Sequence, residues 1–139
     1  MTLIDAYGLI ALVADEPAAP EVETLLRSST CGVVPANLAE AVDSCRRVHR
    51  IPPEDVRTAI EPLTLSGTLV VAMSDERTAW LAAHVRAEHY DRRRCPLSLA
   101  DCFLLAHAIE ADDAIATADP DLARVAELVG IRVAALRRR

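Results

Sequence analysis

The sequence predicts an α/β fold: a parallel β-sheet of about five strands with helices on both of its faces. Short apolar runs alternate with longer stretches of helical character, and this alternation continues from one end of the chain to the other. Size agrees with this fold, because 139 residues of which 52% are hydrophobic can bury a core without disulfides. One domain spanning residues 1–139 is therefore expected.

The predicted strands are short and almost entirely apolar. Strands buried on both faces lack the polar–apolar alternation of half-exposed strands, so continuous apolar runs favour a parallel sheet covered on both sides. Right-handed crossovers then bring the carboxyl ends of the strands to one edge of the sheet. The expected strands are Thr2–Ile4, Cys31–Val34, Leu69–Ala72, Ala114–Ala116 and Ile131–Ala134.

The segments between these strands carry helical patterns bounded by proline, glycine and capping residues. Pro17 and Pro20 are expected to separate the first two helices, and Gly130 is expected to follow the last helix at its C′ position. The dipeptide Pro52–Pro53 ends one helix and opens the next, which extends to about Leu65. The other expected helices are Tyr7–Ala14, Glu21–Arg27, Pro35–Arg47, Asp75–His89, Leu99–Ala111 and Pro120–Leu128.

The basic side chains exclude several enzyme classes. All 15 are arginine, so the chain lacks the lysine that a P-loop uses to bind phosphate and that Schiff-base chemistry requires. It also lacks the G-x-G-x-x-G fingerprint of dinucleotide-binding folds. The net charge is −6, so a nucleic-acid role needs local basic patches or a bound cation instead of bulk attraction.

Three groups of arginines are candidates for such patches: Arg46, Arg47 and Arg50; Arg92–Arg94; and Arg137–Arg139. They either contact nucleic-acid phosphates at the rim of a site or are solvated side chains on helix ends and tails. Arg92–Arg94, just before Cys95 and Pro96, is the most loop-like of the three groups. Because few phosphates would be neutralised, any nucleic-acid binding is expected to depend only weakly on salt.

The sequence predicts neither a signal peptide nor a membrane span, which favours a cytoplasmic protein. Met1–Asp5 lacks the basic n-region of a signal peptide, and no uncharged apolar run reaches the roughly 18 residues of a membrane helix. The four cysteines form no C-x-x-C pair and the four histidines no H-E-x-x-H motif. Reduced thiols are therefore favoured over disulfides, and a zinc site is disfavoured.

Four isolated carboxylates interrupt the apolar stretches. Asp5 directly follows the first expected strand, and Glu40 lies in the helix after the second. Asp101 opens the helix that precedes the fourth strand, and Asp119 follows that strand. In a doubly wound sheet these positions lie at the same edge. The sequence thus predicts that carboxylates from distant parts of the chain meet at one site.

Each acid taken alone also has a structural explanation as a helix cap. Asp5 and Asp119 precede expected helices, and Asp119 is followed by a proline, as at many helix starts. The segments Asn37–Glu40 and Ser98–Asp101 resemble capping boxes. The functional interpretation rests on the conjunction of all four, because unpaired buried carboxylates cost roughly several kcal/mol each and repel one another.

A divalent cation would remove this repulsion. Carboxylate oxygens are hard ligands of the kind that Mg²⁺ and Mn²⁺ prefer. Such an ion polarises a phosphate, lowers the pKa of a bound water and stabilises the leaving oxygen, so the pattern favours phosphodiester hydrolysis. The dipoles of nearby helices keep the acids ionised and oppose the cation by a smaller amount.

The segments around the four acids resemble the PIN-domain nucleases, and most closely the VapC-type toxins of bacterial toxin–antitoxin pairs. The resemblance covers nearly the whole chain, is weakest between about Arg57 and Arg94, and rests on the order and spacing of the acids. It implies a PIN-like parallel sheet and a Mg²⁺- or Mn²⁺-dependent endoribonuclease that acts as a toxin. The segments that carry it are Leu3-Ile4-Asp5-Ala6, Asn37-Leu38-Ala39-Glu40, Leu99-Ala100-Asp101-Cys102-Phe103 and Ala116-Thr117-Ala118-Asp119.

The resemblance also implies roles and partners. Asp5 and Asp101 would be the firmest metal ligands, and Glu40 would complete the pocket and orient the attacking water. Asp119 would hold a second ion or a coordinated water, and Thr117 would hydrogen-bond a ligand or water. The implied partners are an RNA substrate, with tRNA and rRNA as candidates, a cognate antitoxin that blocks the site, and a second copy of the chain in a homodimer.

Three residues and two rival functions stay open on the sequence alone. Tyr7 stands where similar proteins often have a small residue, so its phenol would narrow the pocket or touch RNA. Asp43 and Asp121 are neighbouring acids that compete with the four as ligands. The first rival function is a catalytically inactive PIN fold that serves as a protein-interaction module and uses the acids as caps. The second is a phospho-acceptor receiver domain, which the absence of lysine disfavours.

Overall fold

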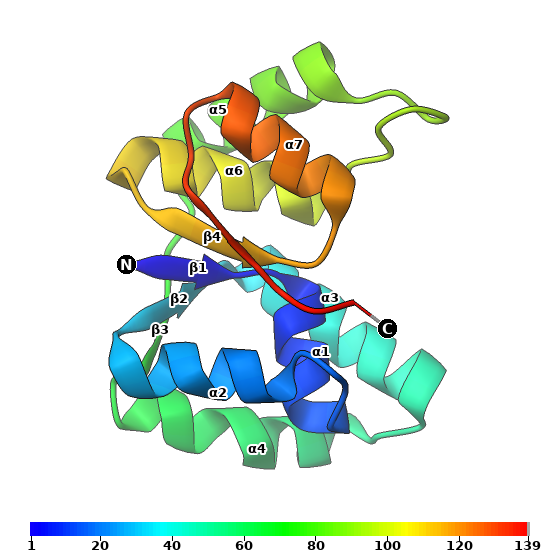
Figure 1. Cartoon of the computed structure of the whole chain (residues 1–139), viewed down its shortest axis with the longest axis vertical. Coiled ribbons are helices and arrows are strands. Elements are labelled where there is room, and N and C mark those ends of the chain that lie inside the picture. Colours follow the sequence, from blue (N-terminus) through cyan, green and yellow to red (C-terminus); the bar gives the residue numbers. More distant parts are fainter. Residues whose placement is uncertain (139) are drawn as a thin grey trace.

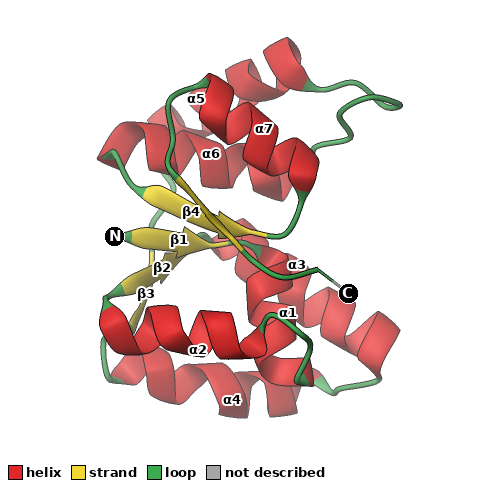
Figure 2. Cartoon of the chain, viewed as in Figure 1, coloured by secondary structure: helices red, strands yellow, loops and turns green. Residues whose placement is uncertain are grey.

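The computed structural model describes residues 1–138 and confirms the predicted α/β fold. In this part of the chain, five parallel strands form one sheet in the order β3-β2-β1-β4-β5 (Figures 1 and 2). The strands are β1 Thr2–Ile4, β2 Cys31–Val33, β3 Leu69–Val71, β4 Ala114–Thr117 and β5 Val133–Ala135.

Helices cover both faces of the sheet (Figure 1). The helices of one face are α5 (Glu76–His89), α6 (Leu99–Ala111) and α7 (Pro120–Leu128). The helices of the other face are α1 (Ala6–Ala14), α2 (Ala19–Ser28), α3 (Pro35–Ser44) and α4 (Pro53–Leu65).

Each face of the sheet has its own apolar core, because alternate strand residues point to opposite sides. Leu3 of β1 and its partner Ile115 of β4 pack with the α5–α7 side chains. The next pair along the same two strands, Ile4 and Ala116, packs with the α1–α4 side chains. All four are almost fully buried, which explains why these strands are continuously apolar in sequence.

The side of the sheet on which successive strands are added changes at β1. From β1 the chain adds β2 and β3 on one side, and it later adds β4 and β5 on the other. The segments that follow the adjacent strands β1 and β4 therefore diverge, since β1 leads into α1 on one face and β4 leads into α7 on the other. In open α/β sheets such a switch point leaves a crevice outside the carboxyl ends of the strands, which is the usual place for a ligand site.

Two of the predicted helices differ in detail from the structure. Pro20 was predicted to precede the second helix, but α2 begins at Ala19 and includes Pro20 in its first turn, where no backbone N–H is needed. The helix predicted over Pro35–Arg47 keeps α geometry only to Ser44. It then continues as a π-helical turn over Cys45–His49.

The last strand begins at Val133, so the prediction that it begins at Ile131 is wrong. The Ile131 N–H donates to the Ala126 carbonyl (2.8 Å) and thereby closes the end of α7 instead of pairing with β4. Gly130 has φ +83° immediately after the C-cap of α7, which confirms its predicted role.

All four cysteines, Cys31, Cys45, Cys95 and Cys102, are buried free thiols. Burial raises the pKa of Cys31, Cys45 and Cys102, so these thiols stay protonated and pack as small apolar groups. Among residues 1–138, no helix is both long and apolar enough to cross a membrane.

Candidate functional site

Asp5 lies at the carboxyl end of β1, beside the switch point of the sheet. Its backbone N–H donates to the Ala116 carbonyl (3.1 Å) and so prolongs the pairing of β1 with β4. Its side chain is nearly inaccessible, at 4% exposure, and Oδ1 accepts from the Gly8 N–H (2.7 Å), which makes Asp5 the N-cap of α1. Gly8 has to lack a side chain here, because a Cβ would lie 2.5 Å from Ile4 Cγ2.

A buried threonine joins Asp5 to the segment after β4. The Thr117 hydroxyl donates to Asp5 Oδ2 (2.5 Å) and accepts from the Asp119 N–H (3.0 Å). Asp119 is exposed and caps α7, because its Oδ1 accepts from the N–H groups of Asp121 (2.8 Å) and Leu122 (3.3 Å). The Thr117 hydroxyl thus fixes the position of one acid relative to the other.

Asp101 lies in the first turn of α6 and forms the predicted capping box with Ser98. The Ser98 hydroxyl accepts from the Asp101 N–H (3.0 Å), and Asp101 Oδ2 accepts from the Ser98 N–H (2.8 Å). Only one carboxylate oxygen takes part, so Oδ1 lies outside the box. The box therefore orients the half-buried Asp101 carboxylate while leaving it an oxygen for another ligand.

Glu40 lies on α3 and is half-buried. The capping box predicted over Asn37–Glu40 does not form, because α3 already begins at Pro35 and both of its members lie inside the helix. Burial raises the pKa of Glu40, the Asp101 charge raises it further, and the Ser98 hydroxyl opposes the rise. Glu40 therefore faces the start of α6 and has no role in starting its own helix.

The charges of the four acids act on one another. Burial raises the pKa of Asp5 to about 7, although its two hydrogen bonds lower it, and the charges of Asp101 and Asp119 add to the rise. Burial raises the pKa of Asp101 as well, with a contribution from Asp119. Three of the acids thus form a mutually repelling group, to which Glu40 is linked through Asp101.

The described part of the chain places no cationic side chain in an ion pair with these acids. Within residues 1–138, none of the four acids forms an ion pair with arginine, histidine or the N-terminus. In the same part of the chain, no three His, Cys, Asp or Glu side chains stand close enough to hold one metal ion as they are placed. The structure therefore gathers the acids at one edge of the sheet without closing them into a ligand cage.

Asn37 is a residue of this region to which the sequence analysis gave no functional role. It is completely buried, and neither its Oδ1 nor its Nδ2 has a hydrogen-bond partner within residues 1–138. It lies three residues before Glu40 and so shares its face of α3. An unpaired buried polar group costs about 1–3 kcal/mol, so an amide here fits an edge that receives a further polar group. In the sequence, Asn37 was interpreted only as a possible helix cap, so its burial without a hydrogen-bond partner was not predicted.

The two rival acids belong to surface ion pairs. Asp43 pairs with Arg46 (3.3 Å) and Arg47 (2.6 Å), which lowers its pKa. Asp121 pairs with Arg124 (3.2 Å). Neither acid therefore shares the electrostatic environment of the buried group.

Tyr7 and the C-terminal tail contact each other. The Tyr7 hydroxyl donates to the Arg137 carbonyl (3.3 Å). The Arg137 N–H and Nε both contact the Glu21 carboxylate, at 2.6 and 3.3 Å. Arg137 is thus held against α2, and Arg139 of the same predicted cluster lies outside the described residues.

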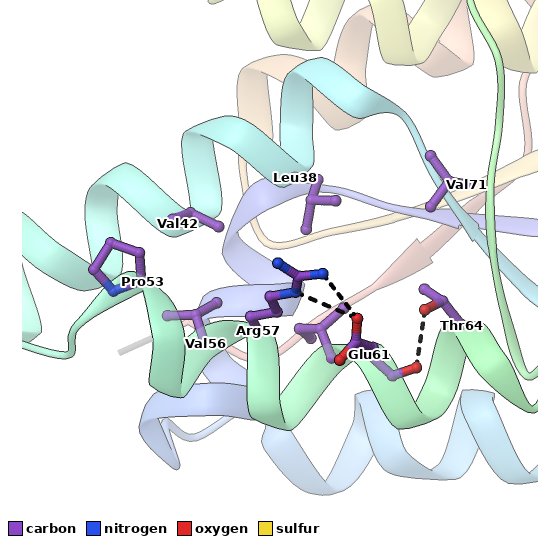
Figure 3. A pocket seen from close by; sticks show the side chains of 9 residues that line it. Leu38, Val42, Pro53, Val56, Arg57, Glu61, Thr64 and Val71 are labelled. Atoms are coloured by element: carbon purple, nitrogen blue, oxygen red, sulfur yellow. Dashed lines mark hydrogen bonds and ion pairs between the residues drawn. The ribbon is translucent and has the colours of Figure 1, made fainter.

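An apolar hollow of about 410 Å³ lies between α3 and α4, away from the acids (Figure 3). Leu38 and Val42 of α3 line it together with Val56 of α4, and the Arg57–Glu61 ion pair (3.1 Å) borders it. Residues two positions apart on a helix point in nearly opposite directions. Glu40 therefore projects from the other side of α3, and the hollow is separate from the acidic site.

The sequence matches the model of the PIN domain family over residues 2–128, which is nearly its whole length. The chain therefore belongs to the PIN domain family. The comparison with curated proteins gave no match.

Solved structures show the same fold. VapBC2 from Rickettsia felis, bound to a DNA fragment from its promoter, aligns with a TM-score of 0.70 at 12% identity, over 98% of both chains. DNA-bound VapBC from Salmonella typhimurium aligns at 0.68 and 21% identity, over 97% of this chain and 98% of that one. FitAcB from Neisseria gonorrhoeae aligns at 0.60 and 18% identity, over 96% of both.

The environment of Asp5 predicts an unusual dependence of stability on pH in the presence of EDTA. The folded pKa of about 7 lies above the ordinary 3.8, so the native state binds the proton more tightly than the unfolded chain does. The contribution of Asp5 is therefore most favourable below about pH 4 and is lost as the pH rises to about 7. As the pH rises between those limits, the free energy of unfolding of Asp5→Asn should increase relative to that of the wild type by on the order of 3 kcal/mol.

Urea unfolding of both proteins from pH 4.5 to 8 measures this difference. Asn retains an acceptor for the Gly8 N–H but places an N–H₂ donor where Asp5 Oδ2 accepts from the Thr117 hydroxyl. That change does not depend on pH, so the pH dependence of the difference between the two proteins, and not its size at one pH, reports the charge. A wild-type minus variant difference that is constant across this range would contradict the burial of an uncompensated carboxylate.

The orphaned amide of Asn37 predicts a stabilising substitution. Asn37→Leu keeps a similar volume and removes two unpaired polar atoms, so it should stabilise the metal-free protein by about 1–2 kcal/mol in urea unfolding. Asn37→Ala serves as the control, since it removes the same amide but leaves a cavity and should gain less. A loss of stability in the leucine variant would show that the amide is hydrogen-bonded in solution.

Proposed function

We propose that this PIN-domain protein is a metal-dependent endoribonuclease that hydrolyses RNA phosphodiester bonds as the toxin of a toxin–antitoxin pair. One observation carries the proposal: a nearly inaccessible carboxylate at the switch point, Asp5, is surrounded by further carboxylates and has no cationic partner among the described residues. Membership of the PIN domain family supports nuclease activity.

The donor set suits a divalent ion with hard-ligand preference, Mg²⁺ or Mn²⁺. All the candidate ligands are carboxylate oxygens, and their repulsion would be relieved by positive charge. In this proposal Asp5 and Asp101 are the principal ligands, Glu40 completes the pocket, and Asp119 holds a second ion or a coordinated water. The bound ion supplies polarisation of the phosphate and a more acidic water.

The residues of the chain itself supply orientation. The hydrogen bonds of Thr117 and Gly8 fix both oxygens of Asp5, and the capping box fixes Asp101. Burial and the Asp101 charge raise the pKa of Glu40, which makes its carboxylate a stronger base toward the proton of an attacking water. Helices α1, α6 and α7 begin at or beside these acids, and the dipoles of the three helices favour a phosphate at this edge.

The proposed partners are an RNA, a small antitoxin and a second copy of the chain. One structure with the same fold, from Klebsiella pneumoniae, is described as a toxin–antitoxin complex, and two others are the DNA-bound VapBC structures. These similarities support a cognate antitoxin that blocks the acidic edge. The net charge of −6 requires RNA to be held by the metal and by local arginines. Substrate candidates are tRNA and rRNA.

A catalytically inactive interaction module is the second candidate. Its support is specific: Asp5, Asp101 and Asp119 each hydrogen-bond backbone N–H groups at the start of a helix. Each of the three therefore has a structural role that needs no metal. The two candidates are separated by whether the purified chain cleaves RNA.

Asp5→Asn should lower RNA cleavage in Mn²⁺ buffer by about two orders of magnitude or more, because the buried anion is lost at the proposed metal position. Asp43→Asn is the matched control, since it makes the same chemical change one helical turn beyond Glu40, in a surface ion pair. It should leave cleavage nearly unchanged. Sequencing of RNA 5′ ends after induced expression, wild type against Asp5→Asn, measures both the activity and the substrate.

The proposal is contradicted if the wild type leaves cellular and bulk RNA intact in Mn²⁺ while remaining folded. It is equally contradicted if Asp5→Asn cleaves RNA at the wild-type rate. The first result would favour the interaction module, and the second would show that Asp5 does not carry the cleavage.

A further inference from the structure

The chain between α5 and α6 forms a tight turn that presents three consecutive arginines, Arg92–Arg94, named here the arginine turn. Asp91 and Cys95 close it with two backbone hydrogen bonds (3.0 and 2.9 Å). Asp91 Oδ1 accepts from the N–H groups of Arg93 and Arg94 (both 2.8 Å), and these bonds lower the pKa of Asp91. The turn therefore has a defined backbone, from which all three side chains are exposed.

The base of the arginine turn is anchored in the protein. Cys95 and Leu97 are buried, and the Arg86 guanidinium donates to the Leu97 carbonyl (2.6 Å). The same guanidinium lies 4.1 Å from the centre of the Tyr90 ring, at the end of α5. Because the base is already ordered, a ligand that binds the turn loses little affinity to backbone ordering.

The three guanidinium groups of the arginine turn have no ion-pair partner in the part of the chain that the structure describes. Among residues 1–138, none of them pairs with an acidic side chain, and the Asp91 carboxylate is engaged by the backbone. Most other described arginines are neutralised. Those in ion pairs are Arg27, Arg46, Arg47, Arg57, Arg77, Arg124 and Arg137.

The arginine turn leads directly into the acidic edge. Ser98, which caps α6, comes four residues after Arg94, and Asp101 comes seven residues after it, so at most about 25 Å of extended chain separates the turn from the acid. In Figure 1 the turn projects beyond the ends of α5 and α6, on the side toward which β1 and β4 point.

We infer that the arginine turn binds the backbone phosphates of the RNA strand that flank the scissile bond; this inference rests on the proposed nuclease function. Guanidinium groups form paired hydrogen bonds with phosphate oxygens. An acidic chain needs a local positive element of this kind to hold a polyanion. Because phosphate contacts carry no base information, the turn sets affinity and the position of the strand and leaves cleavage-sequence preference to other residues.

The test replaces all three arginines by glutamine, R92Q/R93Q/R94Q, and measures binding of a short fluorescein-labelled, mixed-sequence RNA by anisotropy across a salt series. Asp5→Asn serves as the common background, so that the RNA stays intact. Loss of three phosphate contacts should weaken binding about tenfold or more and reduce the slope of log K against log salt by about 2. With the Asp5 carboxylate restored, kcat/KM should fall mainly through a higher KM.

The matched control removes three arginines that are ion-paired elsewhere on the surface: R27Q/R57Q/R77Q. It has the same net charge change, so a bulk electrostatic effect would alter RNA binding equally in both variants. Equal salt slopes in the two triple variants, in a protein whose wild type cleaves RNA, would overturn the inference and leave the proposed function intact. Both triple variants should unfold at the wild-type temperature, since the substituted side chains are exposed.

Two other outcomes are also decisive. If the wild type neither binds nor cleaves RNA in Mn²⁺, the proposed function fails and the inference fails with it. If R92Q/R93Q/R94Q binds RNA normally but no longer binds poly-glutamate, the turn recognises acidic protein segments and the RNA assignment is wrong.

Discussion

The structure depends on the burial of one carboxylate, that of Asp5, at the point where the sheet changes direction. Its backbone extends the pairing of the central strand β1 with β4, and its side chain caps α1 and accepts from the Thr117 hydroxyl. These bonds fix the geometry, but they do not compensate the charge, because the pKa of Asp5 stays near 7. A group placed in this way makes the fold sensitive to whatever positive charge reaches the edge.

Capping and ligand binding are not competing explanations for these acids. At Asp101, one carboxylate oxygen closes the capping box with Ser98, while the second lies outside it. At Asp119, Oδ1 caps α7, while the carboxylate adds to the repulsion felt by Asp5. A cap orients the carboxylate and leaves one of its oxygens free of the cap, so a carboxylate at the start of a helix can also serve as a candidate metal ligand.

Most of the fold was predictable from the sequence. The strands are buried on both faces, so their continuous apolar runs identified them, and their parallel order followed from the intervening helices. The start of α2 and the start of the last strand were not predictable in the same way. The start of α2 depends on the position of Pro20 in a first helical turn, where proline is tolerated. The start of β5 depends on the hydrogen bond between Ile131 and Ala126. Composition reveals neither of these local backbone conformations.

The candidate site was predictable as a set of residues but not as an environment. The isolation of Asp5, Glu40, Asp101 and Asp119 in apolar stretches was visible in sequence, and the structure places all four at one edge. The unpaired amide of Asn37 was not visible, because whether a buried amide finds a partner depends on tertiary contacts.

Thermal unfolding with and without Mn²⁺ tests the central claim most directly. If the acids repel one another until a cation joins them, saturating Mn²⁺ should raise the wild-type Tm above its value in EDTA by about 5 °C or more. Asp101→Asn should unfold at a higher temperature than wild type in EDTA and respond much less to the ion. A wild-type Tm that is the same in EDTA and in Mn²⁺ would contradict this account of the fold and of its site.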